Sequence, residues 1–332
     1  APSPFSTSNG DSMKLATVEN GTRDGVLVVV SNDGSRYLKA NCAPTLQAAV
    51  ESWAECAADL QKLTDRLGNG EGEAASPGCF AAPLPRAWQW LDGSAFDAHG
   101  ELMQRAFGLE PIEHDKPLMY QGMSHQFYGP HEDVPFVSEA DGIDFEGEFG
   151  VIVDDVPMGT SAADAMQHIK LVVLINDWSL RTIAPQEMKT GFGWVQAKPA
   201  CSVAPFAATP DELGDAWADG RVQLNLEVRW NGERFGNAHG GEMSVGFHEL
   251  VAHAAATRSL CAGTIIGSGT VSNDNYREVG SSCISERRSI EMIDKGKPIT
   301  PFMSFGDSIY MEAKNADGSL LFGVIDQYVV QD

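Results

Sequence analysis

The chain has 332 residues, and its 46 Asp and Glu against 23 Lys and Arg give a formal net charge of −23 at pH 7. This charge argues against binding to nucleic acid and to anionic membrane surfaces. The apolar fraction of 43% is typical of a globular protein, and the length suits one large domain or a large and a small one. The longest apolar runs are too short to cross a bilayer.

Residues 1–12 are small, polar and rich in Ser and Pro, without the apolar core of a signal peptide. We interpret them as a disordered leader or tag. The cysteines lack CxxC spacing, which argues against a zinc ribbon or a thioredoxin-like motif. We expect free thiols in a protein of the reducing cytoplasm, because a chain of this size does not need disulfides to hold its core. The six cysteines are Cys42, Cys56, Cys79, Cys201, Cys261 and Cys283.

A small N-terminal domain is predicted over residues 13–80. Residues 14–40 have the pattern of short strands between Gly-containing turns, with Val26–Val30 as a buried strand. From Thr45 to Leu67 the apolar residues recur at helical spacing. The next segment, Gly68–Gly78, is rich in Gly, Glu, Ala and Ser, and it is predicted to be a linker.

The larger domain, residues 81–332, opens with an aspartate and a histidine seven positions apart. A helix is expected up to about Phe107, and His99 lies beside its apolar stripe. From this pattern alone, His99 is either a hydrogen-bonded core residue or a functional one, and Asp92 could be a partner of the helix dipole. The aromatic and polar residues of 116–136 are typical of a loop at the mouth of a site.

Residues 143–153 alternate in the manner of one β-strand. Asp144, Glu146 and Glu148 then share one face, and no Lys or Arg lies between them to relieve their repulsion. A hard divalent cation such as Mg²⁺ or Ca²⁺ would balance these carboxylates, because both ions prefer oxygen ligands. The alternative is an edge strand with a solvated acidic face.

A second acid and a lone lysine follow. The apolar strand Leu171–Ile175 runs into Asp177 and Arg181, and the end of a buried strand often opens onto a functional cleft. Lys198 is the one charged residue in the run from Thr190 to Ala208, which indicates either an extended surface side chain or a functional one.

The remaining elements are mostly predicted strands. Alternation up to Trp230 followed by Asn231-Gly232 predicts a hairpin, and Ser244 is predicted to cap a helix that reaches about Leu260. Thr264–Thr270 is predicted as a strand entering a Gly-rich loop that does not complete a dinucleotide-binding motif. Further strands are expected at Cys283–Ile293, which carries Glu286, at Ser308–Ala313 and at Ser319–Val330.

These features occur in a characteristic order: a His after an Asp, Glu-x-Glu, Asn-Asp-x-Ser-x-Arg, Gly-x-x-x-x-Lys-Pro, Gly-Ser-Gly-Thr, and an acid in Cys-Ile-Ser-Glu. The set resembles the fumarylacetoacetate hydrolase superfamily over about residues 80–330. Met13–Val30 and Pro83–Trp90 are similar to a bacterial fumarylacetoacetase-like branch. The resemblance implies an α+β, β-rich fold, a mixed β-sandwich roll with a small N-terminal α/β domain, usually paired as a homodimer.

The resemblance also implies a site with a divalent cation, Mg²⁺ or Ca²⁺ or else Mn²⁺. It places four acids as metal ligands, His99 as the general base and Glu286 as the carboxylate that orients this histidine. The implied ligands are Asp92, Glu146, Glu148 and Asp177. The implied substrate-side residues are Lys198, Thr270, Tyr120, Arg181 and, as the nearest candidate for a further arginine, Arg105.

The implied activity is metal-dependent hydrolysis of a C–C bond in a β-diketo acid such as fumarylacetoacetate, in aromatic amino acid catabolism. Ala184 stands where such enzymes have a Gln, and the Tyr that follows that Gln has no clear counterpart, so the chemistry is better supported than the substrate. Alternatives are an acylpyruvate or fumarylpyruvate hydrolase, an oxaloacetate decarboxylase, and a 2-oxo-dienoate hydratase or isomerase. A non-enzymatic alternative is a protein with a structural Ca²⁺.

Overall fold

The structure is a computed structural model, and it describes residues 11–111 and 114–332. Residues 1–10 of the predicted leader therefore lie outside the described residues. Its last residue, Ser12, donates its backbone N–H to Oε1 of Gln61 at 3.0 Å. No helix within the two described ranges combines the length and the apolar character that a membrane crossing requires.

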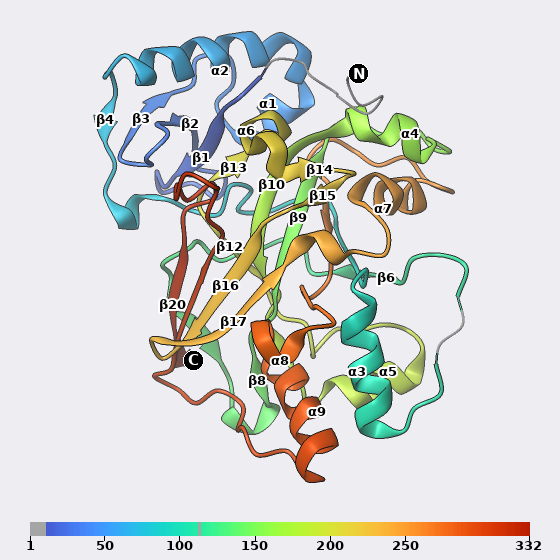
Figure 1. The fold of residues 1–332 in the computed structure, drawn as a ribbon. Helices are drawn as coiled ribbons and strands as arrows, with labels where there is room; N and C mark the ends of the chain where they lie inside the picture. The colour runs from blue at the N-terminus through green and yellow to red at the C-terminus, as the bar shows by residue number, and fades with distance from the viewer. Residues whose placement is uncertain (1–10, 112–113) are drawn as a thin grey trace.

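One 11-stranded sheet runs through the molecule (Figure 1), in the order β4-β3-β2-β1-β13-β10-β9-β18-β5-β6, with β12 paired to β10. Neighbouring strands in this sheet are antiparallel, except for the parallel pair β18 and β5, so the sheet is mixed. Its strands are β1 (Lys14–Val18), β2 (Val26–Val30), β3 (Arg36–Lys39), β4 (Glu73–Ala74), β5 (Trp90–Gly93), β6 (Met119–Gly122), β9 (Gly147–Val153), β10 (Ile169–Asn176), β12 (Ser202–Val203), β13 (Ala207–Ala208) and β18 (Ile265–Gly267).

The N-terminal residues contribute one end of this sheet. The strands expected within 14–40 are confirmed as β1, β2 and β3, and β1 pairs with β13. The sheet therefore continues across residue 80, and the division into two domains there stays a prediction. The linker prediction is wrong in part, because β4 within Gly68–Gly78 pairs with β3. Composition does not reveal pairing to a sheet edge, which uses only backbone groups.

The predicted helix over Thr45–Leu67 is two helices, α1 (Leu46–Glu51) and α2 (Trp53–Gly68), which lie beside the N-terminal strands in Figure 1. Thr45 caps α1 by accepting the N–H of Ala48 at 3.1 Å. Ser52, between the helices, has φ −128° and ψ 41°, a non-helical conformation that breaks the run.

The prediction of six free thiols is wrong for two of them. Cys42 and Cys56 form a disulfide, with 5.4 Å between their Cα atoms. Their separation of 14 residues matches no cysteine motif. Cys42 lies before α1 and Cys56 lies in the first turn of α2, so the two thiols meet only in the folded chain. The cysteines free among the described residues are Cys79, Cys201, Cys261 and Cys283.

A second sheet of five strands covers the first. Its order is β17-β16-β19-β20-β7, and the side chains between the sheets, such as Phe149, Leu226 and Ile325, are fully buried in the main hydrophobic core. The Asn231-Gly232 hairpin prediction is confirmed, with φ of 53° and 79° at its two turn residues. The strands are β7 (Val134–Phe136), β16 (Asn225–Trp230), β17 (Glu233–His239), β19 (Ser308–Glu312) and β20 (Ile325–Gln331). The predicted mixed β-sandwich roll is confirmed.

The prediction of a strand over Cys283–Ile293 is wrong, since this segment is helix α9 (Ile284–Lys295). Its isoleucines suggested a strand because β-branched residues favour sheets. Helix-end signals outweigh them: Cys283 Sγ accepts the N–H of Glu286 at 3.4 Å, and Gly296 ends the helix at φ 77°. In Figure 1, α9 packs beside α3 (Asp97–Phe107).

Helix α7 (Phe247–Ala254) is shorter than predicted, because Gly246 rather than Ser244 precedes it and Leu260 pairs with Val156. The predicted loop 116–136 contains β6 and β7. The other short elements are β8 (Ile143–Asp144), β11 (Ser179–Leu180), β14 (Trp217–Ala218), β15 (Arg221–Val222), α4 (Ala162–Ala165), α5 (Ala184–Thr190), α6 (Pro210–Leu213), α8 (Tyr276–Val279) and the 3-10 helices η1 (Pro77–Cys79), η2 (Glu139–Asp141), η3 (Met166–His168), η4 (Gly214–Ala216) and η5 (Gly240–Glu242).

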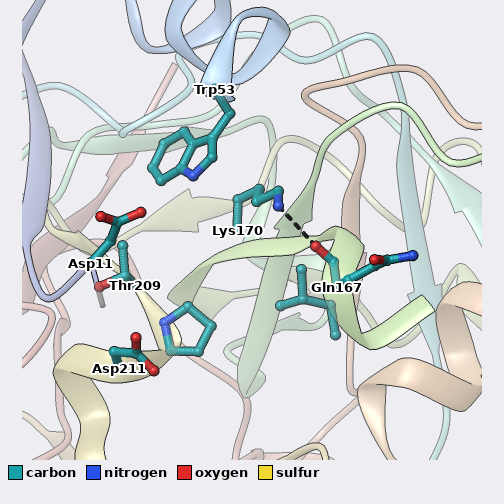
Figure 2. A pocket seen from close by; sticks show the side chains of 8 residues that line it. Asp11, Trp53, Gln167, Lys170, Thr209 and Asp211 are labelled. Atoms are coloured by element: carbon teal, nitrogen blue, oxygen red, sulfur yellow. Dashed lines mark hydrogen bonds between the residues drawn. The ribbon is translucent and has the colours of Figure 1, made fainter. Parts of the chain in front are cut away.

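A small cavity of about 30 Å³ lies where α2 meets β10 and α6 (Figure 2). Trp53, Thr209 and Asp211 line it together with Lys170, whose ammonium donates to the Gln167 carbonyl at 2.8 Å. A wider groove of about 800 Å³ lies between η4 and the strands β16, β17 and β19. None of the predicted site residues lines the cavity or the groove, so the candidate site lies apart from both.

Candidate active site

Four buried carboxylates meet on neighbouring strands of the large sheet. Asp92 lies on β5 and Glu148 on β9, and Glu146 and Asp177 directly flank β9 and β10. One oxygen from each of the four lies within 4.8 Å of the others. Strands β10, β9, β18 and β5 are consecutive in the sheet, which explains how acids so far apart in the chain come together.

The structure corrects the prediction that Asp144, Glu146 and Glu148 share one face of a single strand. The strand is interrupted between β8 and β9, and Glu146 instead pairs with Cys283 in an isolated bridge. Asp144 therefore turns away from the cluster and accepts the N–H groups of Ile284 and Ser285, at 2.7 and 2.9 Å. It stabilises the start of α9, where the helix dipole favours a negative charge.

Two cations contact the cluster. The buried ammonium of Lys198 donates to Asp177 Oδ2 at 2.9 Å and lies 3.6 Å from Glu146 Oε1. The Arg181 guanidinium donates to Asp144 Oδ2 at 2.8 Å and to Glu146 Oε2 at 2.7 Å. Arg181 is thus engaged by two acids, and its predicted role in substrate binding stays a prediction.

These cations divide the acids into two pairs. Burial and the nearby Asp177 carboxylate raise the pKa of Asp92 well above its ordinary value, and burial and Asp92 raise the pKa of Glu148 likewise. For Glu146, burial is outweighed by Lys198 and Arg181, which lower its pKa. Asp92 and Glu148 therefore share the side of the cluster where no Lys or Arg of the described residues forms an ion pair, whereas Lys198 and Arg181 pair with Asp177 and Glu146.

The donor set fits a divalent cation. All four acids offer oxygen atoms, the ligands that Mg²⁺, Ca²⁺ and Mn²⁺ prefer. Oε1 of Glu148 is buried and has no hydrogen-bond partner among the described residues, an unusual state for a carboxylate oxygen. A Cβ atom at Gly267 would lie 2.3 Å from Asp92 Oδ1, so the absence of a side chain there leaves room for the carboxylates. Asp92, Glu146, Glu148 and Asp177 could hold such an ion; their role as ligands stays a prediction.

The predicted histidine and its carboxylate are in direct contact. His99 on α3 and Glu286 on α9 are joined by a hydrogen bond of 2.9 Å between Nδ1 and Oε2. Glu286 is fully buried, whereas the His99 side chain is 18% exposed. The positive charge of a protonated His99 also acts on Glu146, which links this pair to the acids. His99 is therefore hydrogen-bonded beside the acids, and its role as the general base stays a prediction.

The other predicted residues divide by position. Tyr120 donates to Asp177 Oδ2 at 2.8 Å and to Asp92 Oδ2 at 3.3 Å. Thr270 lies close enough to Glu146 for its hydroxyl to help lower the pKa of that carboxyl. Arg105 is exposed in the last turn of α3, and its charge acts on Asp294 of α9. Tyr120 and Thr270 thus lie at the cluster, whereas Arg105 is placed on the surface of the α3–α9 pair.

Cys201 and Trp194 also lie at the site, and neither was predicted. The Cys201 thiol, buried, donates to Asp177 Oδ1 at 3.4 Å. The Trp194 ring meets the Tyr120 ring edge-on at 4.9 Å, and the Lys198 ammonium lies 5.5 Å from both ring centroids. Both residues lie close to Lys198 in the sequence, and this proximity is the signal that could have assigned them to the site.

Comparison with known proteins extends these findings. A family model described as "Fumarylacetoacetate (FAA) hydrolase C-terminal" matches residues 89–329, and one described as "Fumarylacetoacetase N-terminal domain 2" matches residues 13–86. The two together account for nearly all of the described chain.

Among curated proteins, a 2,4-didehydro-3-deoxy-L-rhamnonate hydrolase of Sphingomonas is 25% identical over 158 residues, which are 47% of this chain and 53% of the relative. A mitochondrial oxaloacetate tautomerase of Bos taurus is 25% identical over 158 residues, 47% of this chain and 48% of the relative. The match thus spans about half the length of these curated relatives.

Solved structures share the fold. The fumarylacetoacetate hydrolase of Exiguobacterium antarcticum superposes with a TM-score of 0.66 at 16% identity, covering 97% of this chain and 100% of that one. A fumarylpyruvate hydrolase of Pseudomonas aeruginosa, solved with Mn²⁺ and pyruvate, gives 0.55 at 12% identity over 74% of this chain and 91% of that one.

Proposed function

The chain belongs to the fumarylacetoacetate hydrolase superfamily, and we propose that it is a divalent-metal-dependent hydrolase that cleaves a C–C bond in a β-diketo acid. The observation that carries this proposal is the pairing of His99 with Glu286 beside four buried acids. The acids alone would suit a structural ion. A partly exposed histidine whose Nδ1 faces a buried carboxylate suits proton transfer.

In this proposal Glu286 accepts a hydrogen bond from the Nδ1–H of His99, which leaves Nε2 as the basic nitrogen. Nε2 takes a proton from water, and the resulting hydroxide attacks the substrate carbonyl carbon. The Glu286 carboxylate stabilises the imidazolium that forms, without itself taking the proton. After the C–C bond breaks, the imidazolium returns its proton to the carbon that leaves.

A divalent cation held by the four acids would act as a Lewis acid that polarises the substrate carbonyl. Lys198 contributes a fixed positive charge beside Asp177, where it would offset negative charge that develops on the substrate. Tyr120 holds Asp177 in place through its hydroxyl group, and Thr270 beside Glu146 would contact the substrate. We further propose that the enzyme acts as a homodimer on a small diketo acid and binds neither nucleic acid nor membranes.

The relatives have several activities, so the test has to cover several substrates. The test is product analysis with fumarylacetoacetate, fumarylpyruvate, acetylpyruvate and oxaloacetate, each with and without EDTA. We expect hydrolysis of at least one diketo acid, loss of activity with EDTA and recovery with Mg²⁺, Mn²⁺ or Ca²⁺. Action on oxaloacetate alone would replace the hydrolase by a decarboxylase or tautomerase, and activity unchanged by exhaustive chelation would remove the metal.

A further inference from the structure

We propose that Ser272 and Ser281 are positioning residues that orient Glu286 toward His99. This assignment rests on the proposed function, since it concerns the histidine that acts there as the base. Neither serine belongs to the motifs that pointed to the site.

The contacts assign one function to each oxygen of the carboxylate. The hydroxyls of Ser272 and Ser281 both donate to Glu286 Oε1, at 3.0 and 3.2 Å. The other oxygen, Oε2, faces His99 Nδ1 at 2.9 Å. Two donors on one oxygen fix the plane of the carboxylate, so Oε2 can point only toward the imidazole.

The environment makes these two hydrogen bonds important. Glu286 is fully buried and each serine is only 1% exposed. A buried carboxylate without donors is costly, and the partners found in the described part of the chain are the two hydroxyls and the imidazole. Because the two hydroxyl groups are uncharged, they stabilise the carboxylate by hydrogen bonding alone. The negative charge of Glu286 is therefore left to stabilise a positive charge on His99. Cys283 holds the other end of the residue by accepting its backbone N–H.

The serines are themselves held by β17 of the second sheet. Asn273, next to Ser272, accepts the His239 N–H at 2.7 Å and donates to the His239 carbonyl at 2.9 Å. The backbone of Ser281 lies directly against Gly236, where an added Cβ would be 2.0 Å from the Ser281 carbonyl oxygen. The second sheet is thereby connected to the base through the serines and Glu286.

The test uses the full chain and compares Ser272→Ala, Ser281→Ala and the double variant with Ser282→Ala. Ser282 is the matched control, because it is fully buried next to Ser281 but its hydroxyl has no hydrogen-bond partner among the described residues. We expect kcat to fall roughly ten- to a hundredfold in the single variants, the range seen for outer partners of a functional side chain. KM should stay near its wild-type value in these variants, and the control Ser282→Ala should keep the kcat and KM of the wild type.

The second readout does not depend on the substrate. In metal-free protein labelled with ¹⁵N-histidine, we expect the His99 signal, identified by its loss in His99→Asn, to show Nδ1 protonated. The alanine variants should shift toward a mixture of the two tautomers, and Ser282→Ala should not. Unchanged tautomer signals in the double variant would overturn the assignment, whereas a changed tautomer without turnover of any diketo acid would remove only the proposed function.

If an alanine variant does not fold, Ser272→Cys and Ser281→Cys provide the same comparison, because a thiol is a weaker donor of similar size. They should then show a smaller shift of the tautomer signals in the same direction. Cysteine variants with wild-type tautomer signals and wild-type kcat would also overturn the assignment.

Discussion

The acid cluster and the His99–Glu286 pair lie in the same site but are built in opposite ways. The cluster comes from adjacent strands of one sheet, and it brings together more negative charge than Lys198 and Arg181 balance. The pair comes from two helices, its members lie 187 positions apart in the chain, and its carboxylate has a donor on each oxygen. The first arrangement offers oxygen atoms that could hold a cation, whereas in the second each carboxylate oxygen already has a hydrogen-bond partner.

This difference shows how a fold can serve two chemical needs in one site. Strands in fixed register can hold like charges close together, because the favourable packing energy of the sheet offsets the repulsion between them. Helices α3 and α9 place a base beside its partner, and side-chain hydrogen bonds then set the geometry. A change in the cluster should therefore affect ion binding, and a change in the pair should affect proton transfer alone.

The largest effect is expected from Glu148→Gln. Glu148 carries the buried oxygen without a partner, so its replacement should abolish metal-dependent activity. In the wild type, an ion at about a hundredfold excess over its Kd should stabilise the fold by about 2.7 kcal/mol, and the variant should lack this shift. Without metal, the variant should unfold at a higher temperature than the wild type, because the repulsion between the carboxylates of Glu148 and Asp92 is removed. Thermal unfolding with and without Mg²⁺ or Mn²⁺ measures both, and an equal shift in the variant would contradict the cluster's role.

Replacing the base should separate the two regions. His99→Asn is expected to lower kcat by about 10²- to 10⁴-fold, the usual contribution of a general base. The stabilisation by Mg²⁺ or Mn²⁺ should remain as in the wild type. A variant that loses the ion response as well would show that the regions are not independent.

Arg181 joins the cluster to the start of α9, through Glu146 and Asp144. Arg181→Met should destabilise the protein by about 3–5 kcal/mol, because it leaves the buried Asp144 carboxylate without its cation and Glu146 with Lys198 alone. Urea unfolding monitored by circular dichroism measures the change. The control is Arg277→Met, which removes an exposed pair with Asp294 and should have a far smaller effect.

The smallest effect is expected outside both regions. Reduction of the Cys42–Cys56 disulfide, or the Cys42→Ser/Cys56→Ser variant, should cost about 3 kcal/mol or less, as for a loop of roughly this length. Activity should stay within about twofold of wild type, because both cysteines lie in the N-terminal part. A loss of activity equal to that of His99→Asn would mean that this part supports the site directly.

Much of the fold was predictable where local pattern and final environment agree. Val26–Val30 and the Asn231-Gly232 hairpin have signals that depend only on nearby residues, and both were predicted correctly. The errors occur where the ends of a segment or a distant partner outweigh the pattern within it. The isoleucines of Cys283–Ile293 favoured a strand, but Asp144, some 140 residues earlier, accepts the N–H groups at the start of this helix.

The sequence by itself determined the chemistry of the site, because side-chain types and their order do not depend on how the chain folds. The acids, the histidine and the lysine could therefore be selected before any geometry was known. Only the tertiary structure decided their partners: that Asp144 faces Arg181 rather than the cluster, that Cys42 meets Cys56, and that Ser272 and Ser281 contact Glu286. Such pairings join residues from 5 to 37 positions apart in the chain through short-range forces, and those forces act only after folding has brought the groups within a few ångströms.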